Sequence, residues 1–179
     1  MEYQIFISHC KNGGDALSRM LYDNLTARGY RVFMDVSSLE TGRDDEKIYQ
    51  ALSTCTDVIV VLPPNALDRC IDSDDWVRKE IAQALLLEKR ITPIMMNGFE
   101  FPSSLPDDIA AISKHHGLSY NSVSDLPWIV ESLCRHGYNP NLKPLHKLRT
   151  IPQQKPYLHP PKTRLSRRKK LLAFVQNAF

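Results

Sequence analysis

The chain has 179 residues, 42% of them hydrophobic and 24% charged, as in an ordinary soluble globular domain with a short appendage. It contains no apolar run of about 18 residues, and no long apolar segment of the kind found in signal peptides follows Met1-Glu2-Tyr3, so neither a transmembrane span nor a secretory signal is predicted. The four cysteines (Cys10, Cys55, Cys70 and Cys134) are widely spaced and form no C-x-x-C pair. This favours free thiols in a reducing cytoplasm over a disulfide framework or a structural zinc site.

Basic and acidic residues are distributed unevenly, although the net charge is only +3. Residues 138–179 hold ten of the 23 Lys and Arg residues, none of the 20 Asp and Glu residues and six of the 12 prolines. The charge is therefore +10 over this segment and −7 over residues 1–137. We predict an acidic domain followed by a flexible basic tail with a short amphipathic helix near residues 165–176. The tail would either meet a partner protein, a nucleic acid or an anionic surface, or serve only solubility.

Short apolar segments alternate with segments of helical period along residues 1–137. Strands are predicted, in chain order, over residues 3–8, 30–35, 58–62, 91–96 and 117–120. Helices are predicted around residues 17–25 and 48–52, and over residues 72–85 and 125–133. Apolar strands that alternate with amphipathic helices indicate βαβ units and a parallel sheet covered on both faces. The expected fold class is therefore α/β, a flavodoxin-like, doubly wound sheet of five parallel strands.

The helix predicted over residues 72–85 carries the pair of residues that most suggests chemistry. Trp76 and Glu80 are four residues apart and therefore lie on one face of the helix, near its start. A ring beside a carboxylate is compatible with a small-molecule site, although such a pair taken alone is more often a packed edge that carries a solvated charge. Ligands of doubly wound folds bind outside the carboxyl ends of the strands. The segments expected at that edge are residues 8–12, 35–44, 63–76 and 97–101.

Several common sites are missing from the sequence. It lacks the G-x-x-x-x-G-K-[ST] pattern of a P-loop, the G-x-G-x-x-G pattern of a hydride-transfer dinucleotide site and the G-x-S-x-G pattern of an esterase. His9 is adjacent to Cys10, and His115 is adjacent to His116. Neighbouring side chains of a strand point to opposite faces, so neither pair predicts a metal site or a Cys–His site, and no metal is expected.

A wider set of segments carries a family resemblance. These segments are Phe6-Ile7-Ser8, Val32-Phe33-Met34-Asp35-Val36, Leu39-Glu40-x-Gly42, Val60-Val61-Leu62 and Asp75-Trp76-x-x-x-Glu80-Ile81. Together they resemble the TIR (Toll/interleukin-1 receptor) domain, from about residue 3 to residue 134. The resemblance is greatest to the NAD-cleaving branch, which includes the TIR domain of the animal axon-degeneration NADase and bacterial defence proteins. Residues 65–70, 75–85 and 98–100 resemble the signature of that branch.

The resemblance implies an NAD+ glycohydrolase or cyclase that releases nicotinamide and forms ADP-ribose or a cyclic ADP-ribose. It further implies innate immune, antiviral or cell-death signalling, and activation by self-association into a homo-oligomer or filament. Glu80 would be the catalytic residue, and Trp76 would line the nicotinamide side of the pocket. The other residues implied to bind substrate are His9, Lys11, Asp35, Glu40, Gly42 and Asp44. NAD+ is then a substrate, and no cofactor is expected.

The chain departs from this branch on the side of the pocket opposite Trp76. His9, Cys10 and Lys11 occupy positions where the animal enzyme has an aromatic residue followed by two arginines. Asp44 likewise replaces an aromatic residue. The alternative function is that of a non-catalytic TIR adaptor that acts through TIR–TIR assembly, which has no need of a glutamate at position 80.

Overall fold

The computed structural model describes residues 2–34 and 45–136. The basic tail predicted over residues 138–179, its short helix and the domain boundary at residue 137 lie outside the described residues. Within the described ranges, no helix is both long enough and apolar enough to cross a membrane.

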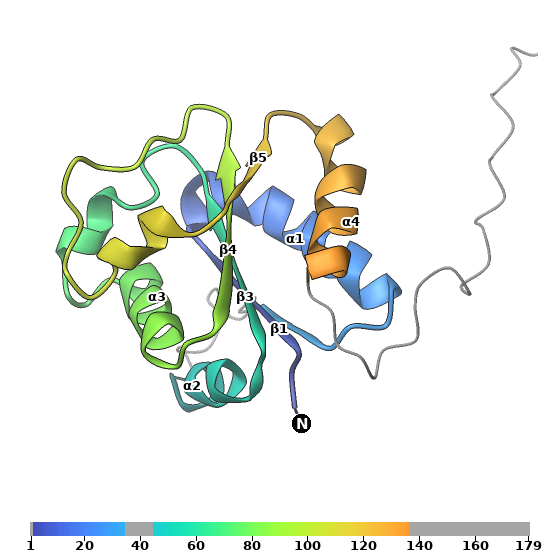
Figure 1. The fold of residues 1–179 in the computed structure, drawn as a ribbon, viewed down its shortest axis with the longest axis horizontal. Coiled ribbons are helices and arrows are strands. Elements are labelled where there is room, and N and C mark those ends of the chain that lie inside the picture. Colours follow the sequence, from blue (N-terminus) through green and yellow to red (C-terminus); the bar gives the residue numbers. More distant parts are fainter. Residues whose placement is uncertain (1, 35–44, 137–179) are drawn as a thin grey trace, which may run out of the picture. The chain divides into compact units, whose positions relative to one another are not determined.

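The domain is built on a five-stranded sheet in which all neighbouring strands are parallel (Figure 1). The strands are β1 (Ile5–His9), β2 (Val32–Met34), β3 (Asp57–Leu62), β4 (Arg90–Met96) and β5 (Leu118–Tyr120). Their order across the sheet is β2-β1-β3-β4-β5. The chain thus runs outward from β1 to β2 and then crosses to the other side of β1. The predicted flavodoxin-like, doubly wound parallel sheet is confirmed.

Helices cover both faces of this sheet. They are α1 (Lys11–Ala27), α2 (Asp45–Thr54), α3 (Trp76–Leu86) and α4 (Leu126–His136), with short 3₁₀ helices η1 (Asp68–Ile71), η2 (Ala110–Lys114) and η3 (Val123–Asp125). In Figure 1, α2 and α3 lie on one side of the sheet, and α1 and α4 lie on the other. The sequence predicts the four α-helices but not the 3₁₀ helices, because single turns are too short to show a hydrophobic period.

Each face of the sheet has its own apolar core, because side chains alternate along every strand. Phe6 of β1 and Val58 and Val60 of β3 pack in one cluster with the buried residues of α2 and α3. Ile5 and Ile7 of β1 pack in a second cluster with those of α1 and α4. Burial of each such side chain contributes about 1.5–3 kcal/mol, so both helix layers are held firmly against the sheet.

The first turn of α1 contains a kink at the carboxyl edge of the sheet. Asn12 and Gly13 have non-helical backbone angles there, and Gly13 has a φ of +91°. Glycine adopts this left-handed conformation without steric strain. A Cβ atom at Gly13 would lie 3.2 Å from the Cβ of Pro63, which follows β3. The glycine therefore allows the start of α1 to approach the end of β3 closely.

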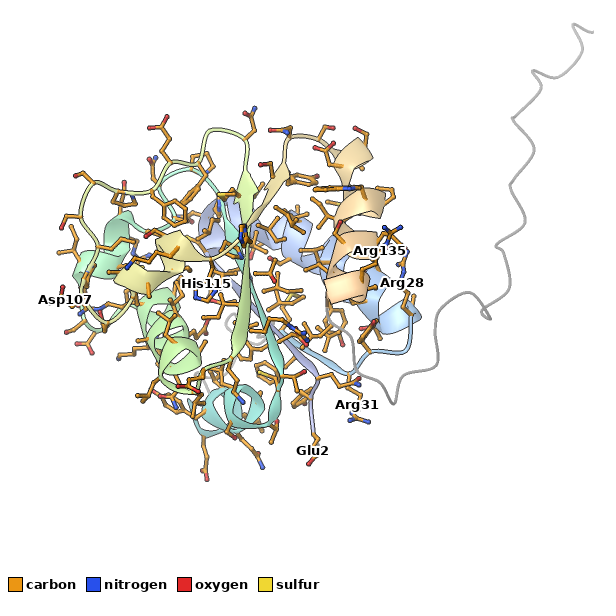
Figure 2. The ribbon with its side chains drawn as sticks, in the orientation of Figure 1. Glu2, Arg28, Arg31, Asp107, His115 and Arg135 are labelled. Atoms are coloured by element: carbon orange, nitrogen blue, oxygen red, sulfur yellow. The ribbon has the colours of Figure 1, made fainter. Side chains whose placement is uncertain are left out.

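The amino ends of the strands are fastened by polar contacts. Arg31 Nε donates a hydrogen bond to the backbone oxygen of Glu2 over 2.6 Å, and Figure 2 shows these two residues close together near the start of β1. Arg90 of β4 pairs with both carboxylate oxygens of Asp57 in β3, and this pairing raises the pKa of Arg90. The opposite, carboxyl edge is where β1 and β3 diverge into their loops. It is the edge at which a doubly wound sheet binds ligands.

Candidate active site

Helix α3 begins at Trp76, directly after the residue that caps it. Asp75 Oδ1 accepts a hydrogen bond from the backbone N–H of Arg78 over 3.1 Å. The contact satisfies one of the free donors of the first turn and places a negative charge at the positive end of the helix dipole. The sequence predicts the start of this helix within residues 72–75. The structure sets it at the last of these residues, because Asp72 ends η1 instead.

The guanidinium of Arg78 braces this first turn against its neighbours. Its Nη1 donates hydrogen bonds to the backbone oxygens of Cys70, over 3.3 Å, and Ile71, over 3.0 Å. Its Nε donates to Oδ2 of Asp108 over 3.0 Å. The Cys70 thiol in turn donates to Asp75 Oδ1 over 3.6 Å. Burial raises the pKa of this thiol to about 12, so it keeps the proton that it donates.

Glu80 is a buried carboxylate at the carboxyl edge of the sheet. Only 4% of the residue is exposed, and it lies one helical turn after Trp76. Ser8, the penultimate residue of β1, donates its hydroxyl hydrogen to Glu80 Oε2 over 2.6 Å. Removal of a carboxylate from water is costly unless polar groups compensate for the lost solvation. A buried glutamate at a ligand edge is therefore a strong candidate for a functional residue.

Trp76 is half-buried and carries a cation beside its ring. Nζ of Lys79 lies 4.9 Å from the centroid of the indole and 2.9 Å from Oδ1 of Asp74. A cation over an aromatic ring contributes about 0.5–1 kcal/mol at an exposed site. The contact restrains the orientation of the indole, which lies at the mouth of the site.

A cavity of about 220 Å³ opens between the end of β1, the start of α1 and the start of α3. Its lining includes His9, Lys11, Arg69 and Trp76 together with several carboxylates of residues 72–75. The structure thus brings together three of the residues predicted to bind substrate. Glu80 is not among the lining residues, because it lies one turn farther along α3, in the interior.

The volume of this cavity is below the range of about 300–1,000 Å³ that is usual for ligand sites. Residues 35–44, which the sequence places at the same edge, lie outside the described residues. A larger cavity, of about 440 Å³, lies along α2 and the outer side of α3. Neither Trp76 nor Glu80 lines that larger cavity, so it is not the site that the sequence predicts.

His9 is directed toward α1, whereas its neighbour Ser8 is directed toward α3. Nε2 of His9 lies 3.0 Å from Oδ1 of Asp15 in α1, and only 12% of the His9 side chain is exposed. The alternation of side chains along β1 accounts for the two directions. Lys11 follows as an exposed cation at the edge of the cavity. Cationic and anionic side chains therefore line the same cavity.

Two residues of this site are absent from the sequence prediction. Ser8 ends an otherwise apolar run, and alternation from Phe6 is the signal that would have placed it on the face of α3. Arg69 is 76% exposed, and its Nε lies 3.7 Å from Oδ2 of Asp75. It reaches the cavity only because η1 forms, and no hydrophobic period predicts that turn.

Four of the predicted substrate-binding residues, Asp35, Glu40, Gly42 and Asp44, lie outside the described residues and remain predictions. Among the residues that the structure does describe, no group of three or more His, Cys, Asp or Glu side chains is arranged to hold a metal ion.

Comparison with known proteins gives the family. Residues 5–126 match the model of the TIR domain. The chain belongs to the TIR domain family. Two curated relatives are NAD(+) hydrolase tir-1 of Caenorhabditis elegans, 37% identical over 125 residues, and NAD(+) hydrolase SARM1 of Danio rerio, 39% identical over 121 residues. These matches cover 66% and 65% of this chain but only 13% and 17% of the two relatives, so the chain spans a small part of their length.

A plant relative of this TIR domain is named as a synthase of a cyclic ADP-ribose and not as an NAD(+) hydrolase. It is the "Probable 2' cyclic ADP-D-ribose synthase BdTIR" of Brachypodium distachyon, 30% identical over 112 residues, with 60% of this chain and 47% of the relative covered. Among solved structures, the TIR domain of the Toll-related receptor TRR-2 from Hydra magnipapillata has a TM-score of 0.55 at 19% identity. That match covers 76% of this chain and 99% of the other. Likeness at this identity shows the fold alone, which agrees with the observed sheet order.

Proposed function

We propose that this TIR domain cleaves the bond between nicotinamide and ribose in NAD+, with Glu80 as its catalytic carboxylate. The observation that carries the proposal is a buried glutamate one turn after Trp76 at the carboxyl edge of the sheet. The two relatives named NAD(+) hydrolases support NAD+ as the substrate. NAD+ is consumed in this reaction and is not retained as a cofactor.

The chemistry of NAD+ explains why one carboxylate is sufficient. Ordinary glycosidases need a second carboxyl group, because the departing alkoxide must be protonated. In NAD+ the leaving group is a cationic pyridinium, which takes the electron pair of the broken C–N bond and departs as neutral nicotinamide. The site must then stabilise the positive charge that develops on the ribose. A carboxylate held away from bulk water does this more strongly in the transition state than in the ground state.

The cavity residues have complementary roles in this proposal. Trp76 orients the nicotinamide ring by stacking and by cation–π attraction, which contributes about 1–2 kcal/mol in a desolvated site. Lys11 offers a positive charge to the pyrophosphate, and His9 forms part of the opposite wall. Asp35, Glu40, Gly42 and Asp44 complete the substrate contacts. Water capture of the ribosyl cation gives ADP-ribose, and capture by a nucleophile of the same molecule gives a cyclic ADP-ribose.

We also propose that self-association activates the domain, in innate immune or cell-death signalling. The resemblance to NAD-cleaving TIR domains supports this part of the proposal. Turnover that depends on assembly rises faster than in proportion to protein concentration, because the active species forms by association. The four cysteines are all free, which supports a reducing compartment such as the cytoplasm.

The test is nicotinamide release from NAD+ by the full chain over a series of protein concentrations. We expect Glu80→Gln to lower kcat by about 100- to 1,000-fold, since removal of one preorganised electrostatic group from a transition state has an effect of that size. Glu131→Gln is the matched control, because Glu131 lies exposed on α4, where it contacts Arg135. Mass spectrometry of the products separates ADP-ribose from its cyclic forms.

Two results contradict parts of the proposal. If Glu80→Gln releases nicotinamide as fast as wild type, Glu80 is not the catalytic residue. Absence of nicotinamide release at every concentration, together with binding to other TIR domains, would show an adaptor instead of an enzyme.

A further inference from the structure

A hydrogen bond connects the candidate catalytic carboxylate to β1, a central strand of the sheet. Ser8 Oγ and Glu80 Oε2 are 2.6 Å apart, although the two residues are separated by 72 positions in the sequence. Three polar or charged residues are buried within the described ranges, namely Ser8, Ser18 and Glu80. Ser8 and Glu80 form a hydrogen bond with each other, so two of the three buried polar residues meet in one contact within an otherwise apolar region.

The backbone holds Ser8 in one place. It lies in β1, which pairs with β2 on one side and with β3 on the other, where Ser8 is in register with Val60. Phe6, two residues earlier, packs in the cluster of α2 and α3, so alternation directs the Ser8 side chain to the same face. Only 1% of Ser8 is exposed. Its hydroxyl group thus approaches α3 from a strand that has neighbours on both sides.

The chemistry of this contact is directional. A separation of 2.6 Å is typical of a hydroxyl group that donates to an ionised carboxylate, and such hydrogen bonds are about twice as strong as those between neutral groups. Burial alone favours the protonated, neutral form of a carboxyl group, whereas a donated hydrogen bond favours the charged form. The proposed reaction needs the charged form, since the developing positive charge on the ribose has to be stabilised.

We propose that Ser8 is a positioning residue that keeps Glu80 ionised and fixes the orientation of its carboxylate. This inference rests on the proposed function of Glu80 and assigns the control of that group to β1. Ser8 acts only through Glu80 and makes no contact with the substrate. Loss of the hydroxyl group should therefore slow the chemical step and leave NAD+ binding almost unchanged.

The kinetic test compares hydroxyl deletion with hydroxyl retention in the full chain. We expect Ser8→Ala to lower kcat by about 10- to 100-fold, the size expected for one hydrogen bond to a charged group, with KM for NAD+ changed by less than about twofold. Ser8→Thr keeps the donor and should retain kcat within about threefold of wild type. Ser18→Ala is the matched control, because it removes an equally buried serine hydroxyl that has no hydrogen-bond partner among the described residues. It should leave both constants unchanged.

A second measurement needs no turnover. Infrared difference spectra between wild type and Glu80→Gln isolate the bands of the Glu80 carboxyl group in the absence of NAD+. We expect a carboxylate band in wild type that shifts, or converts to the band of a neutral acid, in Ser8→Ala. If Ser8→Ala does not fold, Ser8→Cys keeps the side-chain size with a weaker donor and should give an intermediate kcat and an intermediate band.

The outcomes separate this inference from the proposed function. Active wild type, inactive Glu80→Gln and an unchanged kcat in Ser8→Ala would overturn the role of Ser8 alone. A rise in KM without a fall in kcat would overturn it as well. Inactive wild type would refute the proposed function, and the infrared comparison would still decide the inference. A protonated Glu80 in wild type, or identical bands in Ser8→Ala, would contradict it.

Discussion

Replacement of Asp75 by alanine should destabilise the domain, because this carboxylate supports the start of α3 and its junction with η1. Oδ1 accepts from the backbone N–H of Arg78 over 3.1 Å and from the thiol of Cys70 over 3.6 Å. Oδ2 lies 3.7 Å from Nε of Arg69. Asp75→Ala removes all three contacts at once. Asp75→Asn is the matched variant, because it keeps an oxygen acceptor for the helix cap but loses the negative charge.

The size of the effect follows from these contacts. Loss of an N-cap acceptor costs about 1 kcal/mol, within a range of about 0.5–2 kcal/mol. The thiol of Cys70 loses its acceptor in a buried position, which adds a few tenths of a kcal/mol or more. The ion pair adds almost nothing, because Arg69 is 76% exposed and its charge is screened by solvent. We therefore expect a loss of about 1.5 kcal/mol for Asp75→Ala and of less than about 0.5 kcal/mol for Asp75→Asn.

Urea unfolding followed by far-ultraviolet circular dichroism measures both values. This signal is preferable to tryptophan fluorescence, because Trp76 is adjacent to the substituted residue and its emission would change for local reasons. Equal destabilisation by alanine and asparagine would show that the charge, and not the cap, is what matters at this position. An alanine variant as stable as wild type would refute the reasoning altogether.

Two further predictions concern buried polar groups. Ser18→Ala should raise the free energy of unfolding in urea by about 0.5–1 kcal/mol, since the buried hydroxyl has no partner among the described residues and alanine is the better helix former. Ser53→Ala, at an exposed position of α2, measures the contribution of helix propensity. Any loss of stability in Ser18→Ala would contradict the prediction. The free energy of unfolding should also fall as the pH rises above 9. Burial raises the pKa of Cys55 from 9.0 to about 11, and burial together with the charge of Asp75 raises that of Cys70 to about 12. Burial also raises the pKa of Tyr30, from 10.0 to about 12. The unfolded chain releases these protons first, so the folded state loses its advantage from about pH 9 upward, and a flat unfolding profile between about pH 8 and 11 would exclude this effect.

The fold follows from the sequence because its signals are local and repeated. Continuous β-branched runs predict β3 and β4, and amphipathic periods predict the helices that flank them. Strand ends are less predictable, because pairing partners set them. Residue 9 extends β1 beyond its predicted end, since it pairs in register with Val61, whereas Tyr3 has no partner in the sheet.

The candidate site was predictable where its members share one element. Four-residue spacing alone places Trp76 and Glu80 on one face of α3. The hydrogen bond from Ser8 depends on the order of strands and on the height at which α3 packs over β1. The residue pattern of β1 or of α3 alone gives neither the strand order nor the packing height, so this contact can be recognised only in the folded domain. The cation over the indole, in contrast, arises from Lys79 three residues away on the same helix, and helical spacing would have suggested it.

The side chains of Ser8 and His9 point to opposite faces of the sheet, and this determines which substitutions can change one side of the cavity without the other. The two neighbours serve different helix layers, one through Glu80 of α3 and the other through Asp15 of α1. Under the proposed function, substitution of His9 and Asp15 would therefore change the wall of the cavity next to α1 and leave the Ser8–Glu80 contact in place. Deletion of one residue within β1 would instead exchange the two directions and disable both walls together. Point substitutions at His9 and Asp15 therefore affect one side of the cavity, whereas a deletion within β1 affects both sides.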